Sequence, residues 1–163
     1  MGLYFEDFTT GTAFTSPSRT VTETDVVMFA ALSGDMNEIH TSEVWAHKHG
    51  AFGRRVAHGL LCLGIGHALM LRLGILEGTA VALLGFSDWR FTAPVFFGDT
   101  LHVEFQVAEA RPSRSHPDRG VVTFACAYTN QDGVVVQAGR QVVMVRRRDR
   151  GSADTAAGGR GPA

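Results

Sequence analysis

Three polar side chains close together in the sequence are the first candidates for chemistry. Asp35, Asn37 and His40 lie in the segment Leu32-Ser33-Gly34-Asp35-Met36-Asn37-Glu38-Ile39-His40. A carboxylate and an imidazole can together transfer protons at neutral pH, which the addition or removal of water requires. Each residue also has an ordinary structural role: Asp35 as a turn former, Asn37 bonding its own backbone, and His40 capping the next element. The spacing alone leaves both a catalytic group and a structured turn open.

The histidines that follow raise the possibility of a metal site. His40, His47, His49 and His58, together with Asp35, are residue types that bind zinc. However, His47 and His49 are two residues apart, so on a helix they point to different faces. We therefore expect no metal and no other cofactor.

Two helices are expected around this polar segment. Thr22 and Asp25 form a weak version of a capping box, apolar residues continue with helical spacing to Leu32, and Gly34 provides a stop. A second, short helix is expected from about Glu43 to His49, ending at Gly50. The polar segment between them is expected to be a surface loop, where a polar cluster can face a pocket.

A long apolar stretch from Gly59 to Leu73 predicts the central helix. It is too short to cross a membrane, and His67 and Arg72 interrupt it. Its large apolar residues occupy nearly every side of a helix, which is typical of a helix buried in a core. These residues are Leu60, Leu61, Leu63, Ile65, Leu69, Met70, Leu71 and Leu73.

After this helix the apolar period changes from helical to two, which predicts strands. The first expected strand covers 80–92 and 95–97 and is either broken or ended near Pro94. It is followed by a strand over 100–110, a loop over 111–120, a strand over 122–128, a hairpin turn at 130–133 and a return strand over 134–145. The result is a single α+β domain in which a mostly antiparallel sheet backs the buried helix.

Composition limits the partners. The chain of 163 residues has 15 basic and 16 acidic side chains and a net charge of −1, which gives no electrostatic reason to expect nucleic acid or an anionic membrane. Low charge with 45% hydrophobic residues favours burial of apolar surface by a second subunit, as in a homodimer or larger homo-oligomer.

Compartment and boundaries follow from simple signals. Cys62 and Cys126 are far apart and lie in apolar runs, so both are expected to be reduced and buried. The N-terminus has no basic start and no long apolar stretch, so no secretory signal is expected and we predict a cytoplasmic protein. Residues 1–147 are assigned to the domain, and 148–163, rich in Gly, Ala and Ser, to a disordered tail.

Three blocks in order resemble one family. The first is Ser33-Gly34-Asp35-Met36-Asn37-Glu38-Ile39-His40, preceded by Phe29-Ala30-Ala31-Leu32. The second is Phe52-Gly53-Arg54-Arg55-Val56-Ala57-His58-Gly59-Leu60-Leu61, and the third is Trp89-Arg90-Phe91-Thr92-Ala93-Pro94-Val95-Phe96-Phe97-Gly98-Asp99. Together they resemble the MaoC-like, (R)-specific enoyl-CoA hydratases from about Phe5 to Val145.

The resemblance implies a single hot-dog domain, with an antiparallel sheet wrapped around the central helix, and dimers with an acyl-thioester tunnel near the subunit interface. It implies reversible hydration of a 2-enoyl thioester, carried by CoA or acyl carrier protein, to the (R)-3-hydroxyacyl thioester. Asp35 and His40 match the family's catalytic pair, and Gly59 matches the glycine whose backbone N–H contacts the thioester oxygen. We expect Asn37, His58 and His67 to contact the substrate, with His58 also positioning the helix start by a hydrogen bond.

The chemistry agrees with these residue types. A carboxylate and an imidazole that hold one water between them can make both proton transfers on one face of the substrate. A backbone N–H at a helix N-terminus suits the negative charge that develops on the thioester oxygen. Glycine leaves room for the thioester to approach, because it has no Cβ.

Two departures from the family pattern concern the loop and the acyl pocket. Glu38 stands where the family usually has proline, and it either loosens the loop or remains a solvated side chain. His67 stands where some members have serine, and it is either a satisfied core or interface residue or a group that adjusts the acyl pocket.

Two other functions are compatible with a hot-dog fold. One is an acyl-CoA thioesterase, although thioesterases do not resemble the loop that carries Asp35 and His40. The other is a non-catalytic acyl-binding subunit, which would be expected to have lost one of these two residues.

Overall fold

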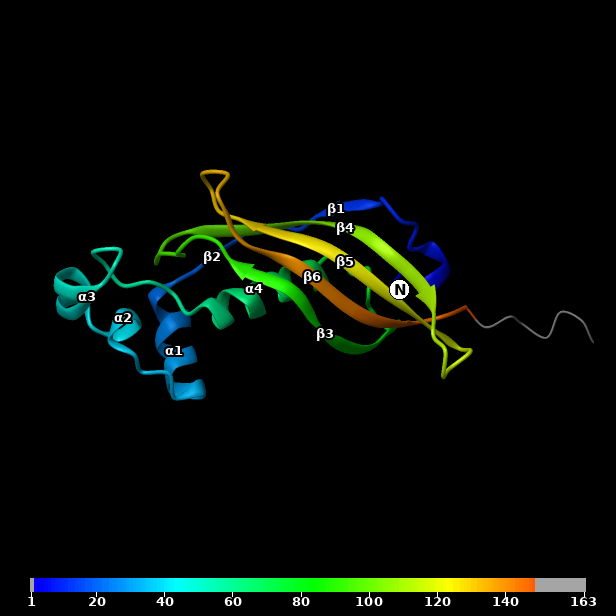
Figure 1. Ribbon diagram of the computed structural model, residues 1–163, viewed down its shortest axis with the longest axis horizontal. Coiled ribbons are helices and arrows are strands. Elements are labelled where there is room, and N and C mark those ends of the chain that lie inside the picture. Colours follow the sequence, from blue (N-terminus) through cyan, green and yellow to red (C-terminus); the bar gives the residue numbers. More distant parts are fainter. Residues whose placement is uncertain (1, 149–163) are drawn as a thin grey trace, which may run out of the picture.

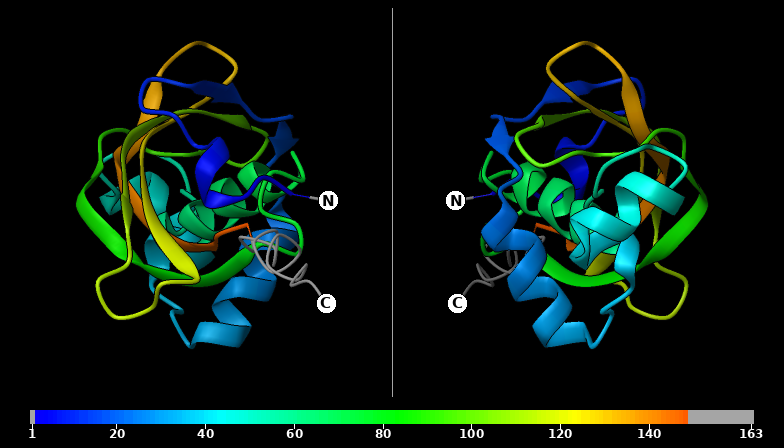
Figure 2. Two further views of the ribbon diagram at one scale, coloured as in Figure 1. Left: turned by 90° about the vertical axis from the view of Figure 1, so that its right-hand side faces the viewer. Right: turned by 90° about the vertical axis from the view of Figure 1, so that its left-hand side faces the viewer.

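The computed structural model describes residues 2–148, in which a six-stranded antiparallel sheet curves around a long helix (Figures 1 and 2). The elements are η1 (Phe5–Asp7), β1 (Ala13–Thr15), β2 (Arg19–Thr20), α1 (Glu23–Ser33), α2 (Glu38–Thr41), α3 (Glu43–His49), α4 (Gly59–Leu71), β3 (Ala80–Phe91), β4 (Thr100–Pro112), β5 (Arg119–Thr129) and β6 (Val135–Arg146). The predicted α+β architecture, with the sheet wrapped around one central helix, is confirmed.

The sheet has the strand order β1-β4-β5-β6-β3, with β2 beside β4. Alternate side chains of β4 point toward α4, as the period of two predicts. The buried side chains of β4 and β5 that form this inner face include Leu101, Val103, Phe105, Val107, Phe124 and Tyr128. The strand β3 pairs only with β6, so it forms an edge of the sheet.

The helix α4 buries one side and exposes the other. Cys62, Ile65, Leu69 and Met70 pack in the core. On the other side Leu60 keeps 64% of its surface exposed. The prediction of a helix buried on nearly every side is therefore wrong for the single chain, because the sheet covers only one of its sides.

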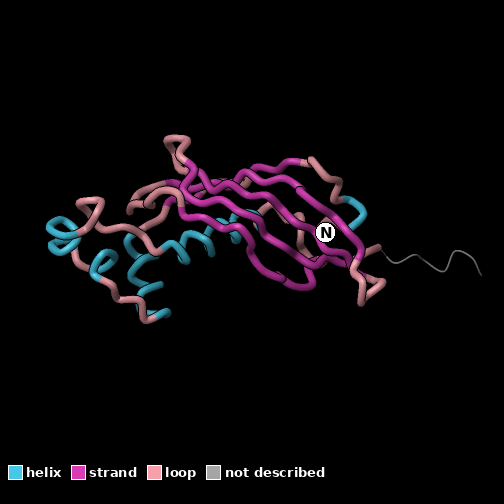
Figure 3. The backbone as a smooth tube through the Cα atoms, in the orientation of Figure 1, coloured by secondary structure: helices cyan, strands magenta, loops and turns pink. Residues whose placement is uncertain are grey.

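The helices α1, α2 and α3 gather beyond one end of the sheet (Figure 3). Thr22 caps α1: its hydroxyl accepts the Asp25 N–H at 3.2 Å, and the Asp25 carboxylate accepts the Thr22 N–H at 2.8 Å. Gly34 ends α1 in the left-handed conformation, with φ of 79°. The predicted capping box, helix stop and Glu43–His49 helix are confirmed.

Three expected boundaries are wrong. Residues 38–41 form the helix α2 instead of a loop, because Asn37 caps the start. Residues 95–97 are not a strand, since Pro94 lacks an N–H and the Asp99 carboxylate accepts the Phe96 N–H. The loop expected over 111–120 is shorter, because β4 continues to Pro112 and β5 begins at Arg119.

The sequence did not predict η1, β1 or β2. These elements have two or three residues each, which is too short for a hydrophobic period to appear. The two strands nevertheless extend the sheet, since β1 and β2 both pair with β4.

The remaining sequence predictions concern cysteines, the end of the chain and membranes. Cys62 and Cys126 are free and buried, as expected. Arg147 and Arg148, at the end of the described part, pair with Glu6 and Asp7, whereas most of the expected tail lies outside the described residues. Within residues 2–148, no helix has the length and apolar character needed to span a membrane.

Candidate active site

The segment after α1 is a chain of local hydrogen bonds. The Asp35 carboxylate accepts the Asn37 N–H at 3.3 Å, and the Asn37 side-chain oxygen accepts the Ile39 N–H at 3.2 Å. Both contacts are typical of Asx turns and helix caps. They fix the backbone between Gly34 and His40 while the Asp35 side chain remains exposed.

The hydrogen bond of His40 fixes its tautomer. The His40 side chain is only 8% exposed, and its Nδ1 lies 2.7 Å from the Val56 carbonyl oxygen. Because a carbonyl oxygen can only accept, Nδ1 carries the proton and Nε2 of the neutral ring is left with a lone pair. Burial lowers the pKa of His40, as does the neighbouring His58, whereas the bond to Val56 and the Asp35 carboxylate act in the opposite direction. The neutral, proton-accepting form therefore dominates near pH 7.

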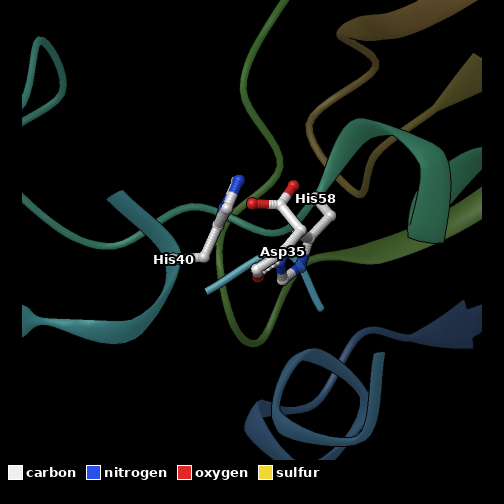
Figure 4. Close-up of side chains that lie close together, drawn as sticks. All are labelled: Asp35, His40 and His58. Atoms are coloured by element: carbon white, nitrogen blue, oxygen red, sulfur yellow. Dashed lines mark hydrogen bonds between the residues drawn. The ribbon is translucent and has the colours of Figure 1, made fainter. Parts of the chain in front are cut away.

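His58 joins the same group from the start of α4. Its ring stacks on that of His40, with centroids 3.8 Å apart, and its Nε2 donates to the Asp35 carbonyl oxygen at 2.9 Å. One polar atom each from Asp35, His40 and His58 lie within 4.8 Å of one another. In Figure 4 the Asp35 carboxylate points toward the His40 ring, and His58 lies beside them.

Gly59 begins α4 directly after this group. The N–H of the first helical residue has no partner within the helix, and the helix dipole adds positive character there. The Gln137 amide donates to the Gly59 carbonyl oxygen at 2.9 Å, and Trp89 donates to Gln137 at 3.1 Å. A Cβ on Gly59 would lie 2.8 Å from the Phe91 ring, so glycine keeps this approach open.

A cavity of about 400 Å³ lies between His40 and Gly59. This volume is in the range of small-molecule sites. The lining is mostly apolar, with His40 and Gln137 as its polar side chains. The other lining residues are Ile39, Ala57, Gly59, Leu60, Cys62, Phe91, Ala93 and Val95. Burial raises the pKa of Cys62 to about 12, so its thiol stays protonated.

The geometry argues against a shared metal ligand set. Within residues 2–148, Asp35, His40 and His58 are the one group with ligand-like spacing. The planes of the two stacked imidazoles differ by 28°. One nitrogen of each ring is already bonded to a backbone carbonyl oxygen, that of Val56 for His40 and that of Asp35 for His58, so only the other nitrogen of each stacked ring could bind a metal. His47 and His49 lie elsewhere, against Gly53 and Trp45 respectively.

The sequence-predicted residues are thus only partly brought together. Asp35, His40, His58 and Gly59 converge, and Asn37 caps α2 beside them. His67 lies two turns along α4, half-buried, with its Nδ1 3.2 Å from Oε1 of Gln141. His58 makes a hydrogen bond at the start of α4, as expected; its partner is the Asp35 carbonyl oxygen, and its side chain does not cap the helix itself.

Sequence reasoning missed the residues that β3 and β6 contribute. Phe91 and Gln137 line the cavity, and Trp89 orients Gln137. Phe91 and Trp89 lie in a block that had been noticed only as a strand. An isolated glutamine in an alternating strand, such as Gln137, gives no local signal of function.

Comparison with known proteins identifies relatives of this arrangement. The model of the MaoC-like domain family matches residues 7–126. The 3-hydroxybutyryl-CoA dehydratase of Methylorubrum extorquens is 35% identical over 148 residues, which are 90% of this chain and 87% of that protein. The (R)-specific enoyl-CoA hydratase of Rhodospirillum rubrum is 34% identical over 145 residues, which are 89% and 93% of the two chains.

Solved structures agree with the sequence relatives. The MaoC-like dehydratase from Rhodospirillum rubrum superimposes with a TM-score of 0.79 at 34% identity, covering 90% of this chain and 99% of that one. A Mycobacterium tuberculosis protein described as having a double hotdog fold superimposes with a TM-score of 0.79 at 19% identity, covering 91% of this chain and 46% of that one. The predicted hot-dog fold is therefore confirmed.

Proposed function

This chain belongs to the MaoC-like domain family and is a hydro-lyase, and we propose that it reversibly hydrates a 2-enoyl thioester to the (R)-3-hydroxyacyl thioester. One observation carries the proposal. The Asp35 carboxylate and the buried His40 imidazole lie within 4.8 Å of each other, beside an apolar cavity that reaches the N-terminus of α4. This arrangement suits a reaction in which water adds next to a thioester carbonyl.

The proton transfers follow from the two acceptors. A water between Asp35 and His40 donates one hydrogen to the carboxylate and the other to the free Nε2 of His40, which leaves an oxygen lone pair aimed at Cβ of the enoyl group. As the C–O bond forms, one of the two acceptors takes a proton from the water. It then returns a proton to Cα on the same face, so the pair ends as it began.

The backbone N–H of Gly59 is proposed to stabilise the intermediate charge. Attack at Cβ moves an electron pair through the conjugated system onto the thioester oxygen. An N–H donor at the start of α4 offers this oxygen a hydrogen bond and the positive end of the helix dipole. The cavity beside Gly59 gives the thioester access to this donor.

Asn37 and His67 are proposed to contact the substrate at its two ends. The side-chain oxygen of Asn37 is used by the α2 cap, so its amide nitrogen is the group that can donate near the thioester. His67 is eight residues after Gly59, about 12 Å along the helix. It would therefore meet only the far end of an acyl chain that runs along α4.

A second copy of the chain is the proposed partner. The edge strand β3 and the outer side of α4 together expose large apolar side chains, among them Leu60, Leu71, Leu83, Leu84 and Phe91. An open strand edge next to apolar surface favours pairing with another chain. The structure described as a double hotdog fold is matched over 46% of its length, which agrees with two such units lying together. Sedimentation should give a dimer or larger oligomer that Leu84→Asp, at the open edge, weakens.

The proposed carrier is CoA. Two relatives that are aligned over most of their length are named for CoA thioesters. An acyl carrier protein thioester presents the same reacting atoms, so the assay must compare both carriers at equal acyl length.

The direct test is hydration of crotonyl-CoA by the purified protein, followed by loss of the enoyl absorbance and chiral analysis of the product. The (R)-3-hydroxyacyl thioester is expected. Asp35→Asn and His40→Ala should each lower kcat by about 10²–10⁴-fold, because each removes a proton-transfer group. Asp132→Asn and His116→Ala change the same residue types at exposed sites and serve as matched controls.

Other outcomes would contradict the proposal in distinguishable ways. Full activity in either site variant would refute the assigned roles. Release of free CoA thiol without hydration would instead indicate a thioesterase. Tight acyl-CoA binding with neither reaction would indicate a non-catalytic acyl-binding subunit.

A further inference from the structure

His58 contacts both members of the proposed catalytic pair but not the cavity. Its side chain is only 2% exposed, and it does not line the cavity that His40 and Gly59 share. Its Nε2 donates to the Asp35 carbonyl oxygen, and its ring stacks on His40. On another side it packs against Phe29 of α1, with ring centroids 4.9 Å apart.

We propose that His58 is a positioning residue that holds Asp35 and His40 in their relative places, the former through a backbone hydrogen bond and the latter through ring stacking. This inference rests on the proposed function and adds to it a third side chain that acts through the other two. It replaces our expectation that His58 contacts the substrate.

The hydrogen bond to Asp35 requires one tautomer of His58. Since the Asp35 carbonyl can only accept, Nε2 of His58 carries the proton and Nδ1 has the lone pair. That Nδ1 is buried and has no hydrogen-bond partner in the described structure. An unpartnered buried nitrogen is costly. The ring is held here by its Nε2 bond to Asp35 and its stacking on His40, both of which reach the catalytic pair, and by its contact with Phe29.

The two histidines are consequently expected to be opposite tautomers. His40 carries its proton on Nδ1, toward Val56, and His58 carries its proton on Nε2, toward Asp35. Each tautomer is set by its own carbonyl partner, so this pairing is a specific signature of the geometry. It can be read in the unmodified protein.

The stacked ring also influences the proton on His40. A charge on His58 would repel a proton on His40, while the Asp35 carboxylate attracts it. The other polar side chains that line the cavity with His40 carry no charge: Cys62 from α4 is a protonated thiol, and Gln137 from β6 is an amide. Removing the His58 ring should therefore move the acidic limb of activity to higher pH.

Two substitutions separate the two contacts of His58. His58→Gln keeps an N–H donor near the position of Nε2 but removes the ring, whereas His58→Phe keeps an aromatic ring and removes the donor. Both should lower kcat by about 10–100-fold with little change in KM, because small misplacements of reacting groups are costly and neither change touches the substrate. The matched control is His116→Gln, at an exposed site, which should leave kcat and the pH profile unchanged.

The decisive measurements do not all depend on activity. Selective ¹⁵N labelling of histidine, with His58 and His40 assigned from their variants, should show the opposite tautomers in the unmodified protein. His40 should also titrate at higher pH in His58→Gln. The same tautomer on both residues of the unmodified protein would overturn the proposal even if the His58 variants failed to fold. An unchanged His40 titration in a folded His58→Gln variant would overturn it as well.

Kinetics then separate this proposal from the proposed function. A wild-type protein with no hydratase activity would refute the function, while the NMR result would still decide the role of His58. If wild type is active and both His58 variants lose only thermal stability, with kcat within twofold and an unchanged pH limb, His58 is a purely structural residue and the inference is wrong.

Discussion

Replacing Gly59 by alanine tests the oxyanion role with the smallest possible change. The backbone N–H remains in Gly59→Ala, and only a methyl group is added. That methyl would project toward the Phe91 ring, 2.8 Å away, on the wall of the cavity. It should therefore obstruct the thioester without removing any hydrogen bond of the fold.

The expected magnitudes for stability and activity differ widely. Phe91 is 55% exposed, so its ring can swing outward, and alanine is the better helix former by up to about 1 kcal/mol. These effects offset each other, and we expect Tm to change by less than about 3 °C. If the methyl keeps the thioester oxygen from reaching the Gly59 N–H, the effect equals the loss of one oxyanion donor, which lowers kcat by about 10²–10³-fold, or about 2.7–4 kcal/mol.

The assay is enoyl-CoA hydration together with thermal unfolding, on Gly59→Ala, Phe91→Leu and the double variant. If a displaced Phe91 ring causes the loss, the smaller leucine should restore activity in the double variant. If the methyl blocks the thioester, the double variant should remain as impaired as Gly59→Ala. Near-normal activity of Gly59→Ala would contradict the proposed approach of the thioester past the side of Gly59 that faces Phe91.

The remaining predictions concern pH, packing, the loop and metals. Burial lowers the pKa of His40 from its ordinary 6.5, and since the neutral ring is the active form, kcat/KM should fall only below pH 6.5; an acidic limb above pH 7 would contradict this. Gly66→Ala should lower Tm by about 3–10 °C, because its Cβ would lie 2.0 Å from the buried Tyr128 ring; an unchanged Tm would show that the ring can move. Glu38→Pro should raise the free energy of unfolding by about 0.4–1 kcal/mol, because the backbone of Asn37, with φ of −54° and ψ of 138°, is already compatible with a following proline. A lower free energy of unfolding in urea would refute this expectation. Dialysis against a metal chelator should leave the hydration rate unchanged, and a loss restored by zinc would reverse the argument against a metal.

The sequence was informative wherever a signal is local. The Thr22–Asp25 capping box, the Gly34 stop and the Asn130–Gly133 turn each depend on contacts within four residues, and all three are present. The polar segment was also predictable as a candidate site, although the residues alone left its function open until the resemblance of three ordered blocks was added. Its helix α2 was missed because four residues are too few to show a period.

Contacts between distant segments could not be predicted from residue patterns. Gln137 meets the Gly59 carbonyl only because β6 runs beside α4, and nothing in an alternating strand distinguishes that glutamine from a solvated one. The exposed outer side of α4 was missed for a related reason. A helix that is apolar on every side is predicted to be buried, but the sequence does not say whether the surface that covers it belongs to the same chain or to a second one.

Glu38 stands where the family pattern usually has proline, and hydrogen bonds between two segments of the chain explain how the loop is held without that proline. His40 reaches from the polar segment to the Val56 carbonyl, His58 reaches back to the Asp35 carbonyl, and the Val56 N–H donates to the Ile39 carbonyl at 3.1 Å. Three hydrogen bonds thus join two segments about 20 residues apart, in both directions. A proline would restrict only one φ angle of a loop that these bonds already hold, so its absence need not loosen the site. Glu38 itself is exposed in the first turn of α2, where a negative charge favours the helix dipole. The order of the site therefore depends on the bonds between the two segments more than on residue 38.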